Sequence, residues 1–127
     1  VPLLVLPLAA ASQPLAQPNV SNGRIAVSVT SEARERMGRD LAWAVLKEVK
    51  RDARFALIEH PSPGLLTIAL PAGIGWERRL DWTEIFFQAR LNSASGRSQV
   101  IAGRCYNWNM SVCARQILDA AAQFGGG

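Results

Sequence analysis

Acidic side chains and the single histidine are the residues of this sequence that could transfer protons. His60 follows Glu59 directly, and Asp81 and Glu84 lie three residues apart further along the chain. Acid–base catalysis needs two groups held at a fixed separation, and a pair of carboxylates on either side of a glycosidic bond can hydrolyse it. These residues support the hypothesis of a small cell-wall-directed hydrolase, or an inhibitor of one. No spacing in the sequence enforces such a pair, so we assign no catalytic residue.

Metal and nucleotide sites lack the residues that they require. A zinc site takes three or four Cys, His or carboxylate ligands, whereas this sequence has one His and two Cys. The stretch Gly73-Ile74-Gly75 lacks the third glycine of a dinucleotide-binding loop, and no Gly-Lys-Ser or Gly-Lys-Thr is present to hold phosphates. We therefore expect neither a metal nor a cofactor.

The two cysteines, Cys105 and Cys113, are the only thiols in the 127-residue chain. An even number of cysteines in a small exported domain favours a disulfide over a metal site. Such a bridge would close a short loop around Trp108 and stabilise the fold by about 2–4 kcal/mol in the loop-entropy model. Two buried free thiols are the alternative.

Two tryptophans bracket two arginines in the segment Trp76-Glu77-Arg78-Arg79-Leu80-Asp81-Trp82. Trp and Arg are enriched among the residues that dominate protein–protein interfaces. We therefore predict a protein-binding surface made of Trp76, Arg78, Arg79, Trp82 and Trp108. Alternatively, the indoles cover an open sheet face and the arginines pair with neighbouring carboxylates.

The beginning of the chain differs in composition from the rest. Its first eighteen residues carry no charge, and all 14 Lys and Arg lie from Arg24 onward. An apolar run followed by small residues is typical of a secretory signal peptide. We expect a signal-peptide remnant at 1–11, a flexible leader at 12–23, one domain at 24–124 and a disordered tail at 125–127. A Pro-broken tail that stays attached is the alternative.

A membrane span is not expected, because crossing the hydrocarbon core takes about 20 apolar residues. Prolines interrupt the apolar run at positions 2, 7, 14 and 18. The formal net charge of +4 suits an acidic partner, although a mild basic excess is also a common solubility feature. Because export argues against nucleic acid, we expect a protein partner and no nucleic acid.

Periodicity predicts the elements that must position these residues. Alternating apolar residues at 25–29 indicate a strand, and Thr30 or Ser31 is expected to cap a long helix that runs to about Ala53. Glu32 and Glu35 would then lie in its first turn. Strands are expected at 55–59 and 65–70.

The second half of the sequence predicts a hairpin between strands at 84–91 and 97–106, followed by a helix that Asn109 or Ser111 caps. Residues 76–82 are interpreted as an irregular connection or a short helical turn. The prediction is an α+β domain with the order βαββββα. Its single, mainly antiparallel sheet has about five strands, and the long N-terminal helix and the C-terminal helix lie on one face.

The order of these elements resembles a group of Gram-negative envelope domains. The resemblance rests on Gly38-Arg39-Asp40-Leu41-Ala42, on Arg54-Phe55-Ala56-Leu57-Ile58, on the hairpin turned at Gly96 and on the closing helix. The chain is similar to the amino-terminal domain of the periplasmic Tol-system β-propeller protein, and more loosely to outer-membrane lipoproteins of the curli-secretion and penicillin-binding-protein-activator type. These share an anticodon-binding-domain-like fold.

The resemblance implies a non-catalytic module in the periplasm of a Gram-negative bacterium that docks to another envelope protein. This chain carries neither the propeller nor a lipidation Cys after its apolar run. A structural stabiliser of an envelope assembly is a further hypothesis, and it predicts an exposed apolar patch or strand edge.

Overall fold

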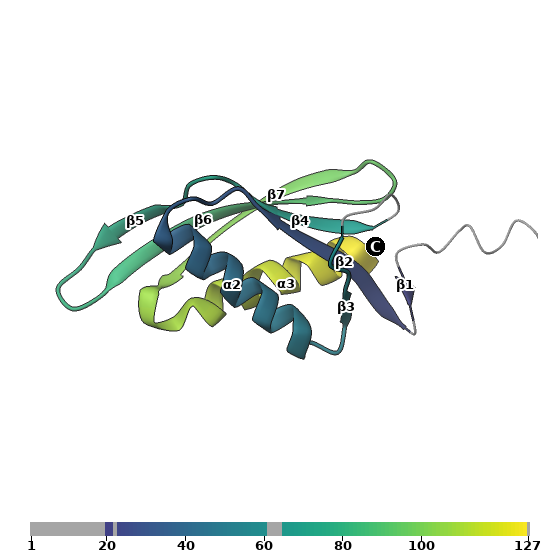
Figure 1. The fold of residues 1–127 in the computed structure, drawn as a ribbon, viewed down its shortest axis with the longest axis horizontal. Coiled ribbons are helices and arrows are strands. Elements are labelled where there is room, and N and C mark those ends of the chain that lie inside the picture. The colour runs from purple at the N-terminus through teal and green to yellow at the C-terminus, as the bar shows by residue number, and fades with distance from the viewer. Residues whose placement is uncertain (1–19, 22, 61–64, 127) are drawn as a thin grey trace, which may run out of the picture.

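The computed structural model describes residues 20–21, 23–60 and 65–126 (Figure 1). The expected signal-peptide remnant and most of the expected leader lie outside these residues. Two leader residues form the short strand β1 (Val20–Ser21), which pairs with the start of β2. The last helix reaches Gly126, so Gly125 and Gly126 are helical although a disordered tail was expected from 125.

A twisted sheet forms one layer, and two helices cover one of its faces (Figure 1). Its strands are β2 (Arg24–Ser31), β3 (Phe55–Leu57), β4 (Leu66–Leu70), β5 (Gly75–Arg78), β6 (Thr83–Asn92) and β7 (Ser98–Tyr106), together with β1. The helices are α2 (Arg36–Arg51) and α3 (Met110–Gly126). The α+β class and the placement of both helices on one face are as predicted.

Register fixes the strand order. Val27 pairs with Leu57 of β3 and with Leu66 of β4, so β3 and β4 lie on opposite edges of β2. On β6, residues 84–92 pair with β7, whereas β4 and β5 pair with the other edge. The continuous order in the described residues is therefore β3-β2-β4-β6-β7, and β1 and β5 are short additions to it.

The sheet is mainly antiparallel, as predicted, but it contains two parallel pairs, and the element order differs from the predicted βαββββα. Both β3 and β4 run parallel to β2, because the chain returns through α2 before it pairs again. The β1–β2, β4–β6, β5–β6 and β6–β7 pairs are antiparallel. Two short strands, β1 and β5, change the predicted order.

Helix α2 is shorter than the predicted helix. Strand β2 continues to Ser31, whose hydroxyl accepts a hydrogen bond from the Ala33 amide and caps no helix. Glu35 is the extended N-cap residue, and its carboxylate accepts a bond from the Ile74 amide. The predicted cap at Thr30 or Ser31 and the acidic first turn are therefore wrong, because pairing with β4 keeps this segment in the sheet.

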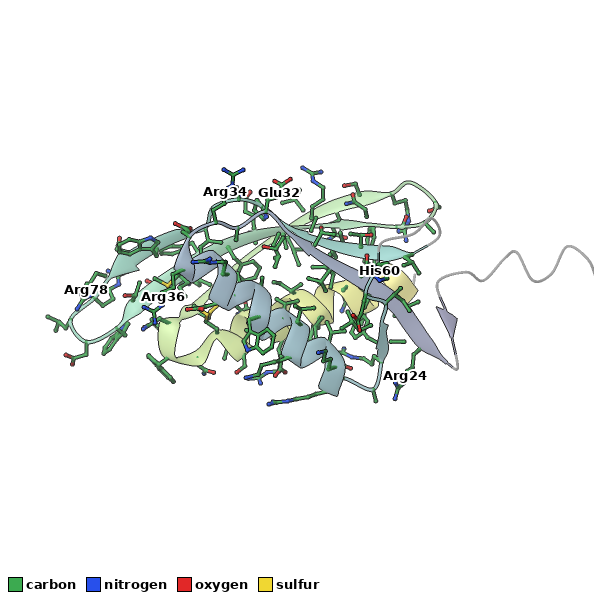
Figure 2. The ribbon with its side chains drawn as sticks, in the orientation of Figure 1. Arg24, Glu32, Arg34, Arg36, His60 and Arg78 are labelled. Carbon is green, nitrogen blue, oxygen red and sulfur yellow. A yellow bond between two sulfur atoms is a disulfide. The ribbon has the colours of Figure 1, made fainter. Side chains whose placement is uncertain are left out.

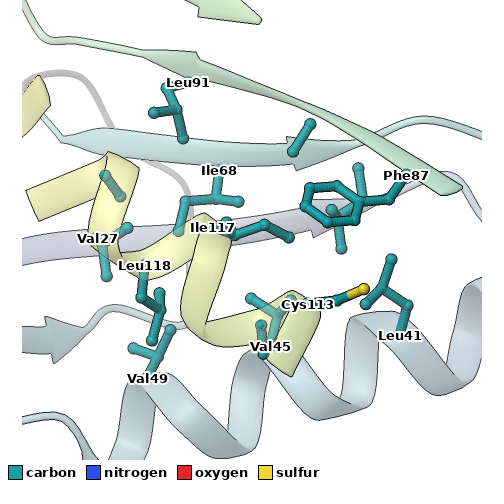
Figure 3. Close-up of a cluster of buried hydrophobic side chains, with 14 of the residues drawn as sticks. Val27, Leu41, Val45, Val49, Ile68, Phe87, Leu91, Cys113, Ile117 and Leu118 are labelled. Atoms are coloured by element: carbon teal, nitrogen blue, oxygen red, sulfur yellow. The ribbon is translucent and has the colours of Figure 1, made fainter. Parts of the chain in front are cut away.

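The core lies between the sheet and the helices, where the apolar residues of α2 and α3 meet those of β2, β4 and β6. Helix α2 buries Leu41, Val45 and Val49, and α3 begins at Met110, directly after a short 3₁₀ turn that ends at Asn109. Arg97, at the β6–β7 turn, donates to the Phe124 carbonyl and so fixes the end of α3. Figure 3 labels the central side chains: Val27, Leu41, Val45, Val49, Ile68, Phe87, Leu91, Cys113, Ile117 and Leu118.

Candidate functional site

The segment around the β5–β6 turn is a hairpin, which corrects the prediction of an irregular or helical connection. Strand β5 pairs with β6 from Gly75↔Phe86 to Arg78↔Thr83, and the Arg79 amide donates to the Trp82 carbonyl across the turn. Its residues therefore alternate between the two faces of the sheet. Figure 2 shows Arg78 at the end of the molecule where this hairpin lies.

This alternation divides the predicted surface. Trp76 pairs with Ile85, a core residue, so Trp76 and Arg78 lie on the helix-side face of the hairpin. Glu77 pairs with Glu84 on the opposite face. The sequence predicted that both indoles and both guanidinium groups form one patch. In the structure, Trp76 and Arg78 lie on one face of the hairpin, whereas Arg79 and Trp82 lie on the other.

On the face away from the helices, Glu84 is held by arginines. Its carboxylate accepts a hydrogen bond of 2.7 Å from Arg79 and lies 3.6 Å from the Arg104 guanidinium. Arg79 also lies 2.9 Å from Glu77. The Glu84 side chain is 8% exposed, whereas that of Arg104 is 71% exposed. The bond to Glu84, and after it the charge of Glu77, raises the pKa of Arg79 above its ordinary value.

Three aromatic rings form a continuous row beside these charges. The Tyr106 ring meets Trp82 edge to face at a centroid distance of 5.9 Å. On its other side it stacks on Trp108 at 5.9 Å with an interplanar angle of 6°. Offset stacking and edge-to-face contact are the favoured arrangements of aromatic pairs. All three residues remain exposed, with Trp108 the most exposed at 67%.

The disulfide and one hydrogen bond to a side chain position this row of aromatic rings. Cys105, at the end of β7, is bonded to Cys113 of α3, and the bridge encloses the short 3₁₀ helix η3 (Asn107–Asn109) that carries Trp108. The Asn107 side chain accepts a bond of 2.8 Å from the Thr83 amide. Trp108 is therefore presented from a segment fixed to both β6 and α3.

We call Arg79, Trp82, Arg104, Tyr106 and Trp108 the tip surface. It borders an open depression of about 590 Å³ lined by Arg79, Trp82, Glu84, Arg104, Cys105 and Tyr106. Flat aromatic faces beside guanidinium groups can cover an apolar patch and donate hydrogen bonds to carboxylate or carbonyl oxygens. This combination of aromatic rings and guanidinium groups is suited to binding the surface of another molecule.

Sequence reasoning found three of these five residues. It identified Arg79, Trp82 and Trp108, and it missed Tyr106 and Arg104. The predicted hairpin could have identified Tyr106, because the register of β6 and β7 pairs Tyr106 with Glu84. Trp43, which is 61% exposed on α2, was also missed.

The acid–base candidates Glu59 and His60 lie apart from the hairpin that carries Asp81 and Glu84. Glu59 and His60 are exposed residues that follow β3, and His60 lies at the opposite end of the sheet from Arg78 (Figure 2). Asp81 is exposed in the β5–β6 turn, and Glu84 is occupied by the two arginines. No cluster of three or more His, Cys, Asp or Glu that could hold a metal occurs within residues 20–21, 23–60 and 65–126.

In the part of the chain that the structure describes, no helix has both the length and the apolarity needed to cross a membrane. No protein-family model and no curated protein matches the sequence.

Solved structures do match the fold. The crystal structure of rare lipoprotein B from Shewanella oneidensis is similar, with a TM-score of 0.57 and 10% sequence identity. The match covers 78% of this chain and 95% of the lipoprotein. A hypothetical protein from Chlamydia trachomatis matches with a TM-score of 0.46 and 8% identity, over 81% of this chain and 96% of that one.

At 10% identity, the likeness to rare lipoprotein B shows a shared fold. It supports the broader resemblance to envelope-lipoprotein folds that the order of elements predicted. The specific resemblance to the Tol-system domain remains a prediction.

Proposed function

We propose that this protein is a non-catalytic module of a Gram-negative cell envelope that binds another envelope protein through the tip surface. The observation that carries the proposal is the row of exposed, mutually stacked rings of Trp82, Tyr106 and Trp108 beside Arg104. The shared fold with rare lipoprotein B supports the envelope setting, and the disulfide agrees with an oxidising compartment such as the periplasm.

The tip surface has the physical properties of an interface centre. Large, stiff aromatic rings release much ordered water when a partner covers them. The disulfide and the bond from Thr83 to Asn107 already order the segment that carries Trp108, so little conformational entropy remains to be lost on binding. Preorganisation of this kind favours a stable complex.

The charges indicate what the partner presents. Arg79 is engaged by Glu77 and Glu84, whereas Arg104 has one contact of 3.6 Å and is largely exposed. Arg104 is thus the guanidinium more available to a partner. We expect the partner to offer an apolar patch with an acidic or carbonyl oxygen at its rim.

The absence of catalysis is part of this proposal. Its support is the separation of Glu59 and His60 from Asp81 and Glu84, since acid–base chemistry needs two groups near one substrate atom. Incubation with purified cell-wall polymer tests it: release of soluble fragments that disappears in Glu84→Gln would refute the non-catalytic assignment.

The binding test uses alanine variants with a matched control. The protein is immobilised, captures a partner from envelope extract, and is then titrated with that purified partner by calorimetry. Interface hot spots contribute about 2 kcal/mol or more, so Trp108→Ala and Tyr106→Ala should weaken binding about 30-fold or more. Trp43→Ala removes an equally exposed indole from α2 and should leave the affinity unchanged.

Trp76→Ala separates the tip surface from the patch that the sequence predicted. Trp76 lies on the other face of the hairpin, so its loss should change the affinity by less than about threefold. Circular dichroism verifies that each variant is folded. Equal affinity of the wild type and of the Trp108→Ala and Tyr106→Ala variants would overturn the assignment of the tip surface.

A structural stabiliser of an envelope assembly is a second candidate, favoured by strand β7. Among the described residues, β7 pairs with a strand on one edge only, and most of its residues are exposed. Gln116 donates to the Arg104 carbonyl and blocks one position of that edge. The variant Ala102→Pro should prevent another strand from pairing with the open edge of β7. If assembly is unchanged in this variant, the role of structural stabiliser is excluded.

A further inference from the structure

A second exposed surface lies on the side of α2 that faces away from the core. The core-facing side carries Leu41, Val45 and Val49, which are buried. On the outward side, Arg39, Trp43 and Lys47 follow one another at four-residue spacing, and Lys50 continues the line. Residues three and four apart are neighbours on a helix surface, so these four form one row. We call it the cationic row.

The charges of this row are not balanced by the helix itself. The two acidic residues of α2 are paired with flanking arginines, Asp40 with Arg36 at 3.9 Å and Glu48 with Arg51 at 3.4 Å. Among the residues that the structure describes, no carboxylate lies within 4.0 Å of Arg39, Lys47 or Lys50. Three positive charges therefore surround Trp43.

Trp43 has no structural role that its surroundings account for. It is 61% exposed in the middle of α2, and no aromatic or cation–π contact involves it within the described ranges. The helix is held by its buried aliphatic residues on the other side. Tryptophan is enriched at membrane–water interfaces, and Lys and Arg side chains are attracted to anionic lipid headgroups.

The shape of the row favours a flat partner. From Arg39 to Lys50 the helix rises about 16 Å. A depression beside the start of α2 is lined by Arg36, Met37, Asp40, Asn107 and Met110, and it includes none of the four residues of the cationic row. A convex row of positive charge is complementary to a planar anionic surface.

We propose that the cationic row of α2 docks the protein onto the surface of an anionic lipid bilayer. Arg39, Lys47 and Lys50 contact the lipid phosphates, and the Trp43 indole enters the headgroup layer. The contact is peripheral, because the buried face of α2 stays in the protein core. This surface is separate from the tip surface, so a membrane-docked protein keeps its partner-binding residues free.

Vesicle sedimentation tests the proposal with the full chain. The probes are vesicles of phosphatidylcholine alone and of phosphatidylcholine mixed with phosphatidylglycerol. Each Lys or Arg near an anionic surface raises binding about fivefold. The variant Arg39→Gln, Lys47→Gln, Lys50→Gln should therefore bind the anionic vesicles about 100-fold more weakly than the wild type. Raising the salt concentration should weaken wild-type binding in the same direction.

Control variants distinguish the row from general charge. The variant Trp76→Ala, Arg78→Gln removes an exposed indole and one cation elsewhere and should change binding no more than about fivefold. Lys47→Arg, Lys50→Arg keeps the charge and should bind like the wild type. In a variant whose other tryptophans are phenylalanine, Trp43 emission should shift to the blue on anionic vesicles and be quenched by brominated acyl chains.

Several results overturn the proposal. These are equal binding of both vesicle types by the wild type, retained binding by the three-glutamine variant, and Trp43 emission that is insensitive to brominated lipid. Binding of soluble polyglutamate through the row without any binding of anionic vesicles would assign the surface to an acidic polypeptide and would also refute membrane docking.

Discussion

The Cys105–Cys113 bridge should contribute a defined share of stability, because it closes a short loop. The two residues are eight apart in sequence. In the loop-entropy model a loop of this length corresponds to about 2.5 kcal/mol at 25 °C. For a domain of this size, such a loss lowers the melting temperature by about 10 °C or more. Reduction by an added dithiol breaks the bridge and adds one hydrogen to each sulfur, so no other atom of the two side chains changes.

Urea unfolding of the oxidised and the reduced protein measures this contribution. We expect the free energy of unfolding to fall by about 2.5 kcal/mol on reduction. The matched control is Cys105→Ala, Cys113→Ala, whose stability should not depend on the reductant. Near-ultraviolet circular dichroism should weaken in the same step, because the bridge holds the Trp108 segment against Tyr106.

A change of less than about 0.5 kcal/mol in the free energy of unfolding on reduction, a fifth of the loop-closure contribution, would refute the loop-entropy account. A loss of stability with an unchanged aromatic signal would refute the role of the bridge in ordering Trp108. The second outcome would mean that packing of α3 against the sheet, and not the bridge, orders the tip surface.

Three further predictions concern other parts of the fold. Glu84→Gln should lower the free energy of unfolding by about 1–2 kcal/mol, because it leaves two guanidinium groups without their carboxylate. The expected loss is small because both arginines are exposed to solvent. Gly103→Ala should lower the free energy of unfolding by about 1–3 kcal/mol, because its Cβ would meet the Gln116 side chain and, at 2.8 Å, the Phe87 ring. The pKa of Asp52 is lowered by its hydrogen bond with Arg54, so the stabilisation is present above the unfolded-state pKa and is lost as the pH falls through the folded-state pKa. Asp52→Asn should therefore remove about 0.5–1 kcal/mol at neutral pH and less in acid.

Urea unfolding measures each of these changes, and each has a distinguishing control. Glu77→Gln changes an exposed partner of the same network and should cost little. Adding Phe87→Leu should recover part of the Gly103→Ala loss, and strictly additive effects would show that the contact is not the cause. A stability difference between wild type and Asp52→Asn that grew as the pH fell below 4 would refute the ion-pair account.

Local patterns in the sequence were sufficient to predict those elements whose pattern of residues lies within a single segment of the chain. The alternation at 84–91 and 97–106 predicted the β6–β7 hairpin, and a helix was predicted where α2 lies, although it is shorter than expected. The cysteine count predicted a bridge between Cys105 and Cys113, and the structure contains it. Periodicity and composition carry this information because the interactions repeat within one segment.

Tertiary structure decided everything that depends on a distant partner. Ser31 stays in β2 because it pairs with Leu70, a residue that no local capping preference could take into account. Pairing with β6 made residues 75–78 a strand, and it thereby separated Trp76 and Arg78 from Arg79 and Trp82. Stacking of Tyr106 between Trp82 and Trp108 likewise joins three segments of the chain. Side chains that meet across strands are set by register, and register is a property of the pair of strands and not of either sequence alone.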